Sequence, residues 1–296
     1  MVETTQARLR LALRAASEIA ALHGLAFERA IVLQNLSNVI VHLAPTSVVA
    51  RVSTTTATVR VGDAWFAREV AVARHLTAAG APIIPLSAEI EPGPHQHLGL
   101  VLSFWKFVQI LDQPFDPFQA GRALRVCHAA LEDFQGTLPI LALISEAQQL
   151  LDQLIAQSEF DAIDVEMLSR VSQRVAHQMQ QLPMQPLHDD PHSGNVLNTT
   201  HGVVWTDWED VMIGPVEWDL ASLVAAPWVF GTDRDKAEVA LDGYGRSFSD
   251  EALNWCIEAR TFVALVWSII LHRQHPSLER QARIERRLQW FRDRER

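Results

Sequence analysis

The sequence has few cysteines, no long apolar run and no excess of basic residues, and each absence excludes a class of protein. Its two cysteines, Cys127 and Cys256, lie far apart, so we expect neither a disulfide framework nor a cysteine metal site and interpret both as reduced core thiols. The longest apolar run, residues 261–271, is shorter than the roughly 18 residues of a membrane span and indicates a buried helix. A formal net charge of −10 argues against nucleic acid as the main partner.

The remaining composition is that of a soluble globular protein. Of the 296 residues, 48% are hydrophobic and 20% are charged, which allows an ample core divided between two lobes. The N-terminal segment lacks the uninterrupted apolar stretch of a signal peptide, so we expect a cytoplasmic protein without a membrane partner. It predicts an amphipathic helix whose apolar stripe is Leu9, Ala12, Leu13, Ala16 and Ala20.

The next part of the chain has the pattern of a small β-sheet. Residues 30–108 contain short β-branched and aromatic runs separated by turn residues, which predict antiparallel strands. Residues 91–97 are expected to supply the turn before the last strand. One helix, predicted over residues 63–80 and ended by Gly80, crosses the sheet.

From Pro117 onward the pattern becomes helical, with apolar residues at spacings of three and four. His128 lies on such an apolar stripe, and we interpret it as a hydrogen-bonded core histidine rather than a catalytic one. The chain contains no internal repeat and no low-complexity linker. We therefore predict an α+β protein with a strand-rich lobe over residues 1–108 and a helical lobe over residues 109–296. Because clefts between lobes are common ligand sites, the functional residues are expected there.

One stretch of the helical region, LHDDPHSGNVLN at residues 187–198, holds two adjacent carboxylates flanked by histidines. Its aspartates, asparagines, proline and glycine favour a loop. Its H-x-D-x4-N pattern, from His188 to Asn195, is followed twelve residues later by Asp207 in an apolar segment. Phosphoryl transfer needs a set of this kind, a carboxylate that deprotonates the attacking hydroxyl and oxygen ligands that hold magnesium.

These paired motifs resemble those of the aminoglycoside phosphotransferases and choline kinase-like enzymes, which have a protein kinase-like fold. HDDPHSGN is similar to the catalytic loop HGDxHxxN of that family, with Asp189 at the usual glycine. The second motif of the family is carried by Asp207, Trp208, Glu209, Gly214, Asp219, Leu220 and Ala221. The resemblance implies a bilobal fold, with a small antiparallel-sheet N-terminal lobe and a larger helical C-terminal lobe. It also implies ATP-dependent phosphoryl transfer to a hydroxyl group of a small molecule.

Roles for the catalytic residues follow from the resemblance. Asp190 would be the catalytic base, and His188 would support its loop. Asn195 and Asp207 would bind Mg²⁺. Asp219 would anchor the loop by accepting backbone hydrogen bonds instead of touching substrate.

The resemblance also implies a set of nucleotide-binding residues. Arg51 stands where protein kinases place a lysine and would grip phosphate oxygens through its two parallel N–H donors. Glu69 would pair with Arg51 and orient it. Four further residues would contact ATP from the nucleotide loop and from the hinge segment LSFWKFV, whose backbone would meet adenine: Ser37, Asn38, Ser103 and Trp105.

The acceptor is expected over the helical lobe near Glu209 and Asp210. Between Asp207 and Glu258 the chain carries twelve acidic residues and three basic ones. Such a surface would concentrate a cationic or amine-bearing acceptor, such as an aminoglycoside-like antibiotic or a metabolite. A solvated helix face would show the same excess.

Asp190 is the predicted base, and Asp189 is not, because only Asp190 stands five residues before Asn195. Neighbouring residues of an extended loop point to opposite sides, so Asp189 should point away from the reacting hydroxyl. Its nearby charge could still raise the pKa of Asp190 and make it a better base.

Two other functions stay open at this stage. Gln34 and Asn35 stand where the nucleotide loop of the family usually has glycines, which is compatible with a nucleotide-binding regulator without catalysis. A metal-dependent hydrolase is the second alternative, with zinc or iron bound by a histidine and carboxylate cluster. Its ligands would be His188, Asp189, Asp190 and His192.

Overall fold

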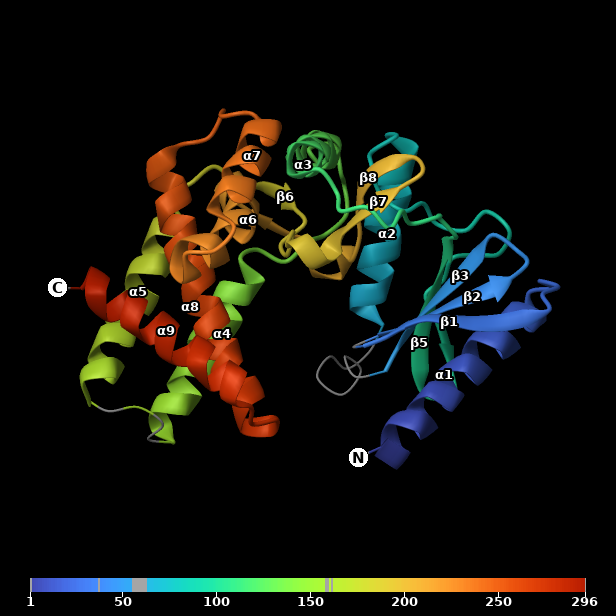
Figure 1. The fold of residues 1–296 in the computed structure, drawn as a ribbon, viewed down its shortest axis with the longest axis horizontal. Coiled ribbons are helices and arrows are strands. Elements are labelled where there is room, and N and C mark those ends of the chain that lie inside the picture. The colour runs from blue at the N-terminus through green and yellow to red at the C-terminus, as the bar shows by residue number, and fades with distance from the viewer. Residues whose placement is uncertain (1, 37, 55–62, 158–159, 161, 296) are drawn as a thin grey trace. The chain divides into compact units, whose positions relative to one another are not determined.

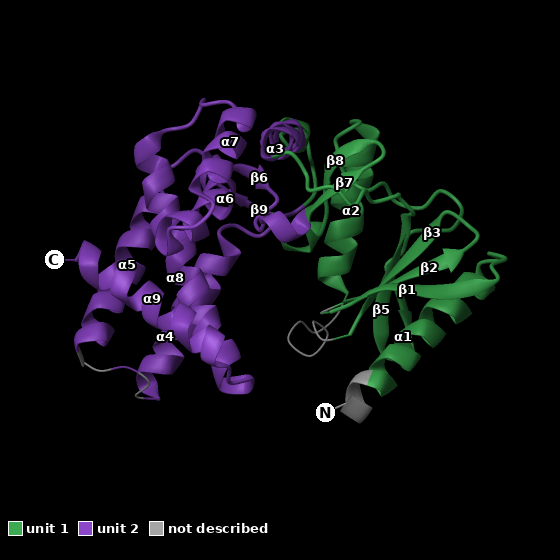
Figure 2. Cartoon of the chain, viewed as in Figure 1, with its two compact units in different colours: residues 1–116, 129–136, 196–211 green, residues 117–128, 137–195, 212–296 purple. Residues whose placement is uncertain are grey.

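The computed structural model describes residues 2–36, 38–54, 63–157, 160 and 162–295 (Figure 1). The chain forms two compact units that interrupt each other in sequence (Figure 2). The sheet unit comprises residues 1–116, 129–136 and 196–211, and the helical unit comprises residues 117–128, 137–195 and 212–296. A single boundary after Val108 therefore does not separate them, and the division of nucleotide and catalytic roles between residues 1–108 and 109–296 stays a prediction.

The sheet unit is built on five antiparallel strands in the order β1-β2-β3-β5-β4, which confirms the predicted sheet. The strands are β1 (Arg29–Asn35), β2 (Asn38–Ala44), β3 (Val48–Ser53), β4 (His95–His97) and β5 (Leu100–Lys106). Residues 95–97 were expected to belong to a turn but form the edge strand β4. The turn itself is made by Leu98 and Gly99, which both have positive φ angles and so reverse the chain within two residues.

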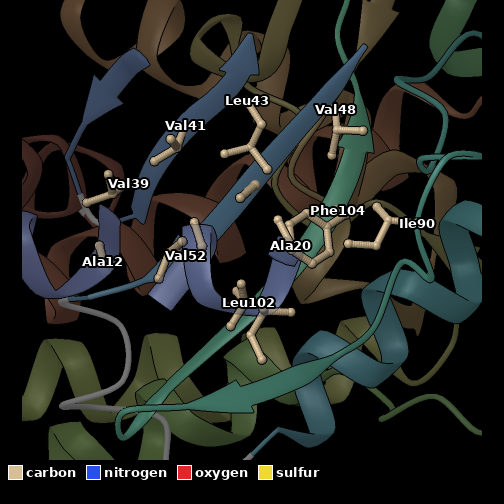
Figure 3. Close-up of a cluster of buried hydrophobic side chains, with 13 residues drawn as sticks. Ala12, Ala20, Val39, Val41, Leu43, Val48, Val52, Ile90, Leu102 and Phe104 are labelled. Atoms are coloured by element: carbon tan, nitrogen blue, oxygen red, sulfur yellow. The ribbon is translucent and has the colours of Figure 1, made fainter. Parts of the chain in front are cut away.

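One face of this sheet packs against α1 (Val2–Leu22), the predicted amphipathic helix (Figure 3). Ala12 and Ala20 of α1 are fully buried against Val52 and the other apolar side chains of the sheet. Since successive strand residues point to opposite faces, burying Val52 on this side directs Arg51 to the other. The hydrophobic core of the sheet unit thus determines the direction of Arg51, the predicted phosphate-binding residue.

The helix α2 (Ala64–Ala78) packs on β5 and on the short helix η3 (Trp208–Asp210). It ends as predicted, because Gly80 takes the left-handed conformation with φ at 69° just beyond it. The hairpin of β7 (Val196–Thr199) and β8 (Gly202–Trp205) also belongs to the sheet unit. It is attached there by β-bridges from Trp205 to Ile83 and from Thr199 to Ile110.

The helical unit surrounds α8 (Asp250–Gln274), which packs against α4, α5, α6 and α9. By length and composition alone α8 could cross a membrane, but 56% of its most apolar window is buried inside the unit. The prediction of a buried helix over residues 261–271 is therefore confirmed. The surrounding helices are α4 (Ala142–Ala156), α5 (Ala162–Met179), α6 (Val216–Phe230), α7 (Arg234–Tyr244) and α9 (Leu278–Arg294).

Two further features of the helical unit position its polar residues. The helix α3 (Pro117–Leu131) approaches α7 so closely that a Cβ atom on Gly243 would lie 2.0 Å from the carbonyl oxygen of Phe118. The strand β6 (Gln185–Leu187) pairs antiparallel with β9 (Met212–Gly214) and leads directly into the HDDPHSGN loop. Both cysteines are buried free thiols, as predicted.

Candidate active site

The HDDPHSGN loop is fixed at its start by Asp219 of α6. The backbone N–H of His188 donates to Oδ2 of Asp219 at 2.9 Å, and that of Asp189 donates to Oδ1 at 3.0 Å. Asp219 has no exposed surface, so these hydrogen bonds form out of contact with water. The expected anchor is therefore present, and it fixes the backbone immediately before Asp190.

The anchor is itself supported by His128 of α3. Nε2 of His128 lies 2.8 Å from Oδ2 of Asp219, and Nδ1 lies 2.9 Å from the hydroxyl oxygen of Tyr244. His128 is 2% exposed, so the interpretation as a hydrogen-bonded core histidine is confirmed. The close approach of α3 to α7 explains how Tyr244 reaches this histidine.

The carboxylate of Asp190 is held by Arg260 of α8, a residue that the sequence analysis missed. Nη2 of Arg260 donates to Oδ1 of Asp190 at 2.6 Å, and Nη1 donates to the carbonyl oxygen of Asp189 at 2.9 Å. Although burial works against ionisation, Arg260 and the nearby histidines lower the pKa of Asp190 below its ordinary value. The pKa of Asp190 is thus lowered overall, and not raised in the way that was expected from the charge of Asp189.

Asp189 itself is buried and points elsewhere. Its residue is 1% exposed, and its Oδ1 accepts a hydrogen bond of 2.6 Å from Nε1 of Trp218. Its φ angle of 77° is the left-handed conformation that glycine adopts most easily, as the resemblance to a glycine position implies. The side chain of Asp190, by contrast, is 36% exposed. Of the two carboxylates, Asp190 is the one that an acceptor could reach.

The remaining loop residues complete the surroundings of Asp190. Asn195, at the end of η2 (Ser193–Asn195), donates from Nδ2 to the carbonyl oxygen of Asp190 at 3.0 Å. The backbone N–H of Gly194 donates to Nδ1 of His192 at 2.9 Å, so a neutral His192 carries its proton on Nε2. That Nε2 lies 3.5 Å from Oδ2 of Asp190.

In the sheet unit, Arg51 is surrounded by three carboxylates. Its guanidinium pairs with Glu69 of α2, with Glu209 of η3 and, at 2.6 Å, with Oδ1 of Asp207. Although burial alone would lower it, the carboxylates raise the pKa of Arg51. The predicted pairing of Arg51 with Glu69 is thus present.

The charges of this cluster do not balance. Burial, together with the charges of Asp207 and Glu209, raises the pKa of Glu69 to about 8 in spite of Arg51. Burial also raises the pKa of Glu209. One guanidinium is therefore shared by more carboxylates than it can neutralise, and the cluster favours binding either a proton or a further cation.

Glu209 lies in the sheet unit and not in the helical lobe where the sequence placed it, and its contact with the acceptor stays a prediction. It is 7% exposed, and its carboxylate is bound to Arg51 within the sheet unit. The prediction took it for part of the helical lobe because η3 follows the catalytic loop in sequence, but residues 196–211 cluster with the sheet. Asp210 lies partly exposed at the end of the same short helix, and its role stays a prediction.

Ser103 and Trp105 lie inside a strand, before the hinge to which the sequence assigned them. Both lie inside β5, opposite Arg51 and Val49 of β3. The N–H groups of Phe104 and Lys106 point away from β3, so those of Ser103 and Trp105 point towards it and are used by the sheet. A hinge would therefore follow the end of β5, and the contacts of Ser103 and Trp105 with a nucleotide stay predictions.

Of the other two predicted nucleotide-binding residues, the structure describes Asn38. Asn38 is 6% exposed and stands opposite Ser53 at the start of β2. Ser37 lies outside the described residues. The contacts of both with a nucleotide stay predictions.

The hydrolase alternative is not favoured by the side-chain directions in the loop. Asp189 binds Trp218, whereas Asp190 binds Arg260, so the neighbouring carboxylates do not converge. Within the described part of the chain, no three histidine, cysteine or acidic side chains are grouped in a way that could hold a metal ion. This argues against a zinc or iron centre formed by the HDDPH segment.

The two predicted magnesium ligands have suitable chemistry. The amide nitrogen of Asn195 donates to the carbonyl oxygen of Asp190, and the amide oxygen is the atom of this side chain that a cation would bind. The side chain of Asp207 is 38% exposed and offers carboxylate oxygen. Oxygen donors of this kind fit Mg²⁺. Asn195 and Asp207 belong to different compact units, and their pairing on one ion stays a prediction.

Comparison with known proteins defines the class to which this fold and site belong. Solved structures similar to the chain include an amicoumacin kinase in complex with AMP-PNP, Ca²⁺ and Ami (15% identity, TM-score 0.74, covering 99% of this chain and 96% of that one). A choline/ethanolamine kinase family protein from Mesorhizobium loti is 18% identical with a TM-score of 0.64, covering 98% and 94%. The AMP-bound spectinomycin phosphotransferase APH(9)-Ia is 15% identical with a TM-score of 0.63, covering 92% and 94%. The fold is thus protein kinase-like, as expected.

The family is established by sequence. The model of the phosphotransferase enzyme family matches residues 35–256, which is most of the chain. The chain therefore belongs to the phosphotransferase enzyme family, as the resemblance of its motifs implies. A search of curated proteins finds no match to the sequence.

Proposed function

We propose that this protein is an ATP-dependent phosphotransferase that moves the γ-phosphoryl group to a hydroxyl group of a small molecule. The acceptor oxygen attacks the γ-phosphorus, the bond from that phosphorus to the bridging oxygen of ADP breaks, and Asp190 receives the hydroxyl proton. Membership of the phosphotransferase enzyme family supports the class of reaction.

The observation that carries the proposal is the state of Asp190. It follows a backbone segment fixed by Asp219, it is the more exposed of the two adjacent carboxylates, and its lowered pKa keeps it ionised at neutral pH. A general base must be deprotonated and within reach of the hydroxyl that it serves. These are the properties that the Asp190 side chain has.

The nucleotide and the metal are assigned with support from the sheet unit and from similar proteins. Arg51, oriented by Glu69, would hold phosphate oxygens, and Asn195 and Asp207 would hold Mg²⁺, which would neutralise phosphate charge. ATP is supported by the AMP-PNP and AMP present in the similar amicoumacin kinase and spectinomycin phosphotransferase. The Ca²⁺ present in the structure of the amicoumacin kinase supports a divalent cation as the metal of the site.

The acceptor is proposed to be a cationic or amine-bearing small molecule, such as an aminoglycoside-like antibiotic or an amino alcohol. The acidic excess between residues 207 and 258 supports this choice, since it would attract a positively charged acceptor. Several of those carboxylates are paired with arginine, for instance Glu238 and Asp242 with Arg246. The attraction of a cationic acceptor would therefore come from the acidic side chains of this segment that are not neutralised by arginine.

A panel of acceptors tests the function directly. Consumption of MgATP should be measured with aminoglycosides, spectinomycin, macrolides, choline and ethanolamine, with the Asp190→Asn variant as the control for background hydrolysis. Transfer to an amine-bearing acceptor that fades at high salt is the expected result. Tight ATP binding without transfer to any acceptor would instead indicate a regulator without catalysis, and transfer only to neutral acceptors would remove the proposed charge preference.

A further inference from the structure

We propose that Arg260 is a positioning residue that orients the Asp190 carboxylate, so that Oδ2 of Asp190 faces the acceptor hydroxyl. The inference rests on the proposed function, because it requires Asp190 to be the base. It adds a residue from α8, far from the two sequence motifs, to the groups that determine the rate of phosphoryl transfer.

The guanidinium of Arg260 binds the catalytic loop at two points. Its two terminal nitrogens bind two consecutive residues, Nη1 at the carbonyl oxygen of Asp189 and Nη2 at Oδ1 of Asp190, at 2.9 and 2.6 Å. A planar fork that binds both a backbone oxygen and the side chain that follows it fixes the side-chain torsions of that residue relative to the loop. One hydrogen bond to the carboxylate alone would not do this.

Arg260 is itself immobilised. Its side chain is 14% exposed, and its guanidinium carbon lies 5.0 Å from the centroid of the Trp218 ring. The indole N–H of Trp218 donates to both the carboxylate and the carbonyl oxygen of Asp189, at 2.6 and 3.1 Å. Asp190 is therefore held by a rigid group of side chains, formed by Arg260, Trp218 and Asp189.

Arg260 engages one oxygen of the Asp190 carboxylate and leaves the other for chemistry. Oδ1 of Asp190 is engaged by Arg260, whereas the partner of Oδ2 within the described helical unit is the half-exposed His192, with 3.5 Å between Oδ2 and Nε2. That separation is too long for a strong hydrogen bond. The hydroxyl proton would accordingly go to Oδ2, and Arg260 would determine the direction in which this oxygen points.

The experiment compares Arg260→Gln and Arg260→Lys with a matched control, Arg174→Gln. Arg174 is also ion-paired to an acidic residue of the helical unit, Glu258 of α8, but does not touch the loop. The assay is single-turnover transfer from MgATP to kanamycin, choline or water, together with AMP-PNP affinity by calorimetry. Arg260→Gln should lower kcat by roughly 10- to 100-fold with nucleotide affinity unchanged, Arg260→Lys should recover part of the rate, and Arg174→Gln should match the wild type.

Chemical rescue separates positioning from a structural role. Guanidinium ion at low millimolar concentration should restore part of the kcat of Arg260→Ala, because it can occupy the vacated space next to Asp190. Guanidinium ion should not change the kcat of Arg174→Ala. Equal slowing of both arginine variants, with no rescue, would reduce Arg260 to a stabilising ion pair.

A double variant distinguishes failure of this inference from failure of the proposed function. If Arg260 acts through Asp190, adding Arg260→Gln to Asp190→Asn should cause no further loss of rate. Wild-type turnover by Asp190→Asn would overturn the proposed function. An inactive Asp190→Asn combined with a fully active Arg260→Gln would overturn the role of Arg260 alone.

Discussion

Arg51 and Glu209 form a buried ion pair in the sheet unit, with 9% of each side chain exposed. Glu209, together with Asp207, therefore occupies one nitrogen of the guanidinium that the proposed function assigns to phosphate oxygens. A nucleotide can bind Arg51 only by sharing or displacing this carboxylate, and Glu209 should lower the affinity of the protein for ATP.

Replacing Glu209 by glutamine should tighten nucleotide binding. The amide keeps the shape of the side chain but removes the negative charge that competes with phosphate, so the Kd for AMP-PNP should fall about tenfold, equivalent to about 1.4 kcal/mol. Calorimetric titration measures this Kd for the wild type and for Glu209→Gln. Glu91→Gln is the control, because Glu91 is an exposed acid paired with Arg74 in the same unit. Weaker binding by Glu209→Gln would show that Glu209 assists the nucleotide instead.

Arg51 and Glu69 should act as a pair on nucleotide affinity. Arg51→Ala removes the proposed phosphate contact and should weaken AMP-PNP binding, whereas Glu69→Ala removes only its orientation and should have a smaller effect. In the double variant the losses should not add, because Glu69 has nothing left to orient. Fully additive losses in the titrations would show that the two residues work independently.

Glu69 should also make the stability of the protein depend on pH. Its pKa is raised from an ordinary 4.5 to about 8, so its neutral form is favoured in the folded state. Its contribution is fully present below about pH 4.5 and is lost as the pH rises through 8. Between these values, the free energy of unfolding of the wild type should fall relative to Glu69→Gln by up to about 1.4 kcal/mol per pH unit. Urea denaturation of both proteins across this range measures the difference, and parallel curves would contradict the raised pKa.

Removing the Asp219 carboxylate, which holds the start of the catalytic loop, should destabilise the protein. Asp219→Ala leaves two buried backbone N–H groups and His128 without their acceptor, and it should lower the free energy of unfolding by about 3 kcal/mol or more. Tyr244→Phe removes one hydrogen bond to His128 and should cost about 1 kcal/mol. Ser222→Ala, also on α6, loses only a bond to a helix carbonyl and serves as the control in urea denaturation.

The features that were predictable from sequence are those with a local pattern. The stripe of α1 follows the helical period, and its alanines are buried as expected. The pairing of Arg51 with Glu69 and the anchoring by Asp219 come with family motifs that keep a fixed order along the chain. In each case the residues that matter are marked by spacing, which a single sequence can show.

The features that were missed depend on contacts between distant segments. Arg260 lies 70 residues after Asp190, and the tertiary packing of α8 alone brings them together. A local sign did exist, because an arginine directly before the apolar segment 261–271 is expected to have a polar partner. Glu209 was misplaced because proximity in sequence to the catalytic loop does not show that η3 packs on α2. Trp105 was misplaced because the end of β5 cannot be located from strand composition to within a few residues.

The two adjacent aspartates, Asp189 and Asp190, should respond differently to substitution. Asp190→Asn keeps the shape of the side chain but removes the proton acceptor, so turnover should fall by orders of magnitude while AMP-PNP affinity stays nearly unchanged. Asp189→Gly should leave an active enzyme, because glycine adopts the φ angle of 77° without strain and the carboxylate lost is the one that faces Trp218. Asp189→Ala is the informative third variant, since it loses the same carboxylate but keeps a Cβ atom at that φ angle. It should be the less stable of the two Asp189 variants by about 1 kcal/mol in urea denaturation. An inactive Asp189→Gly alongside an active Asp190→Asn would exchange the roles of the two carboxylates.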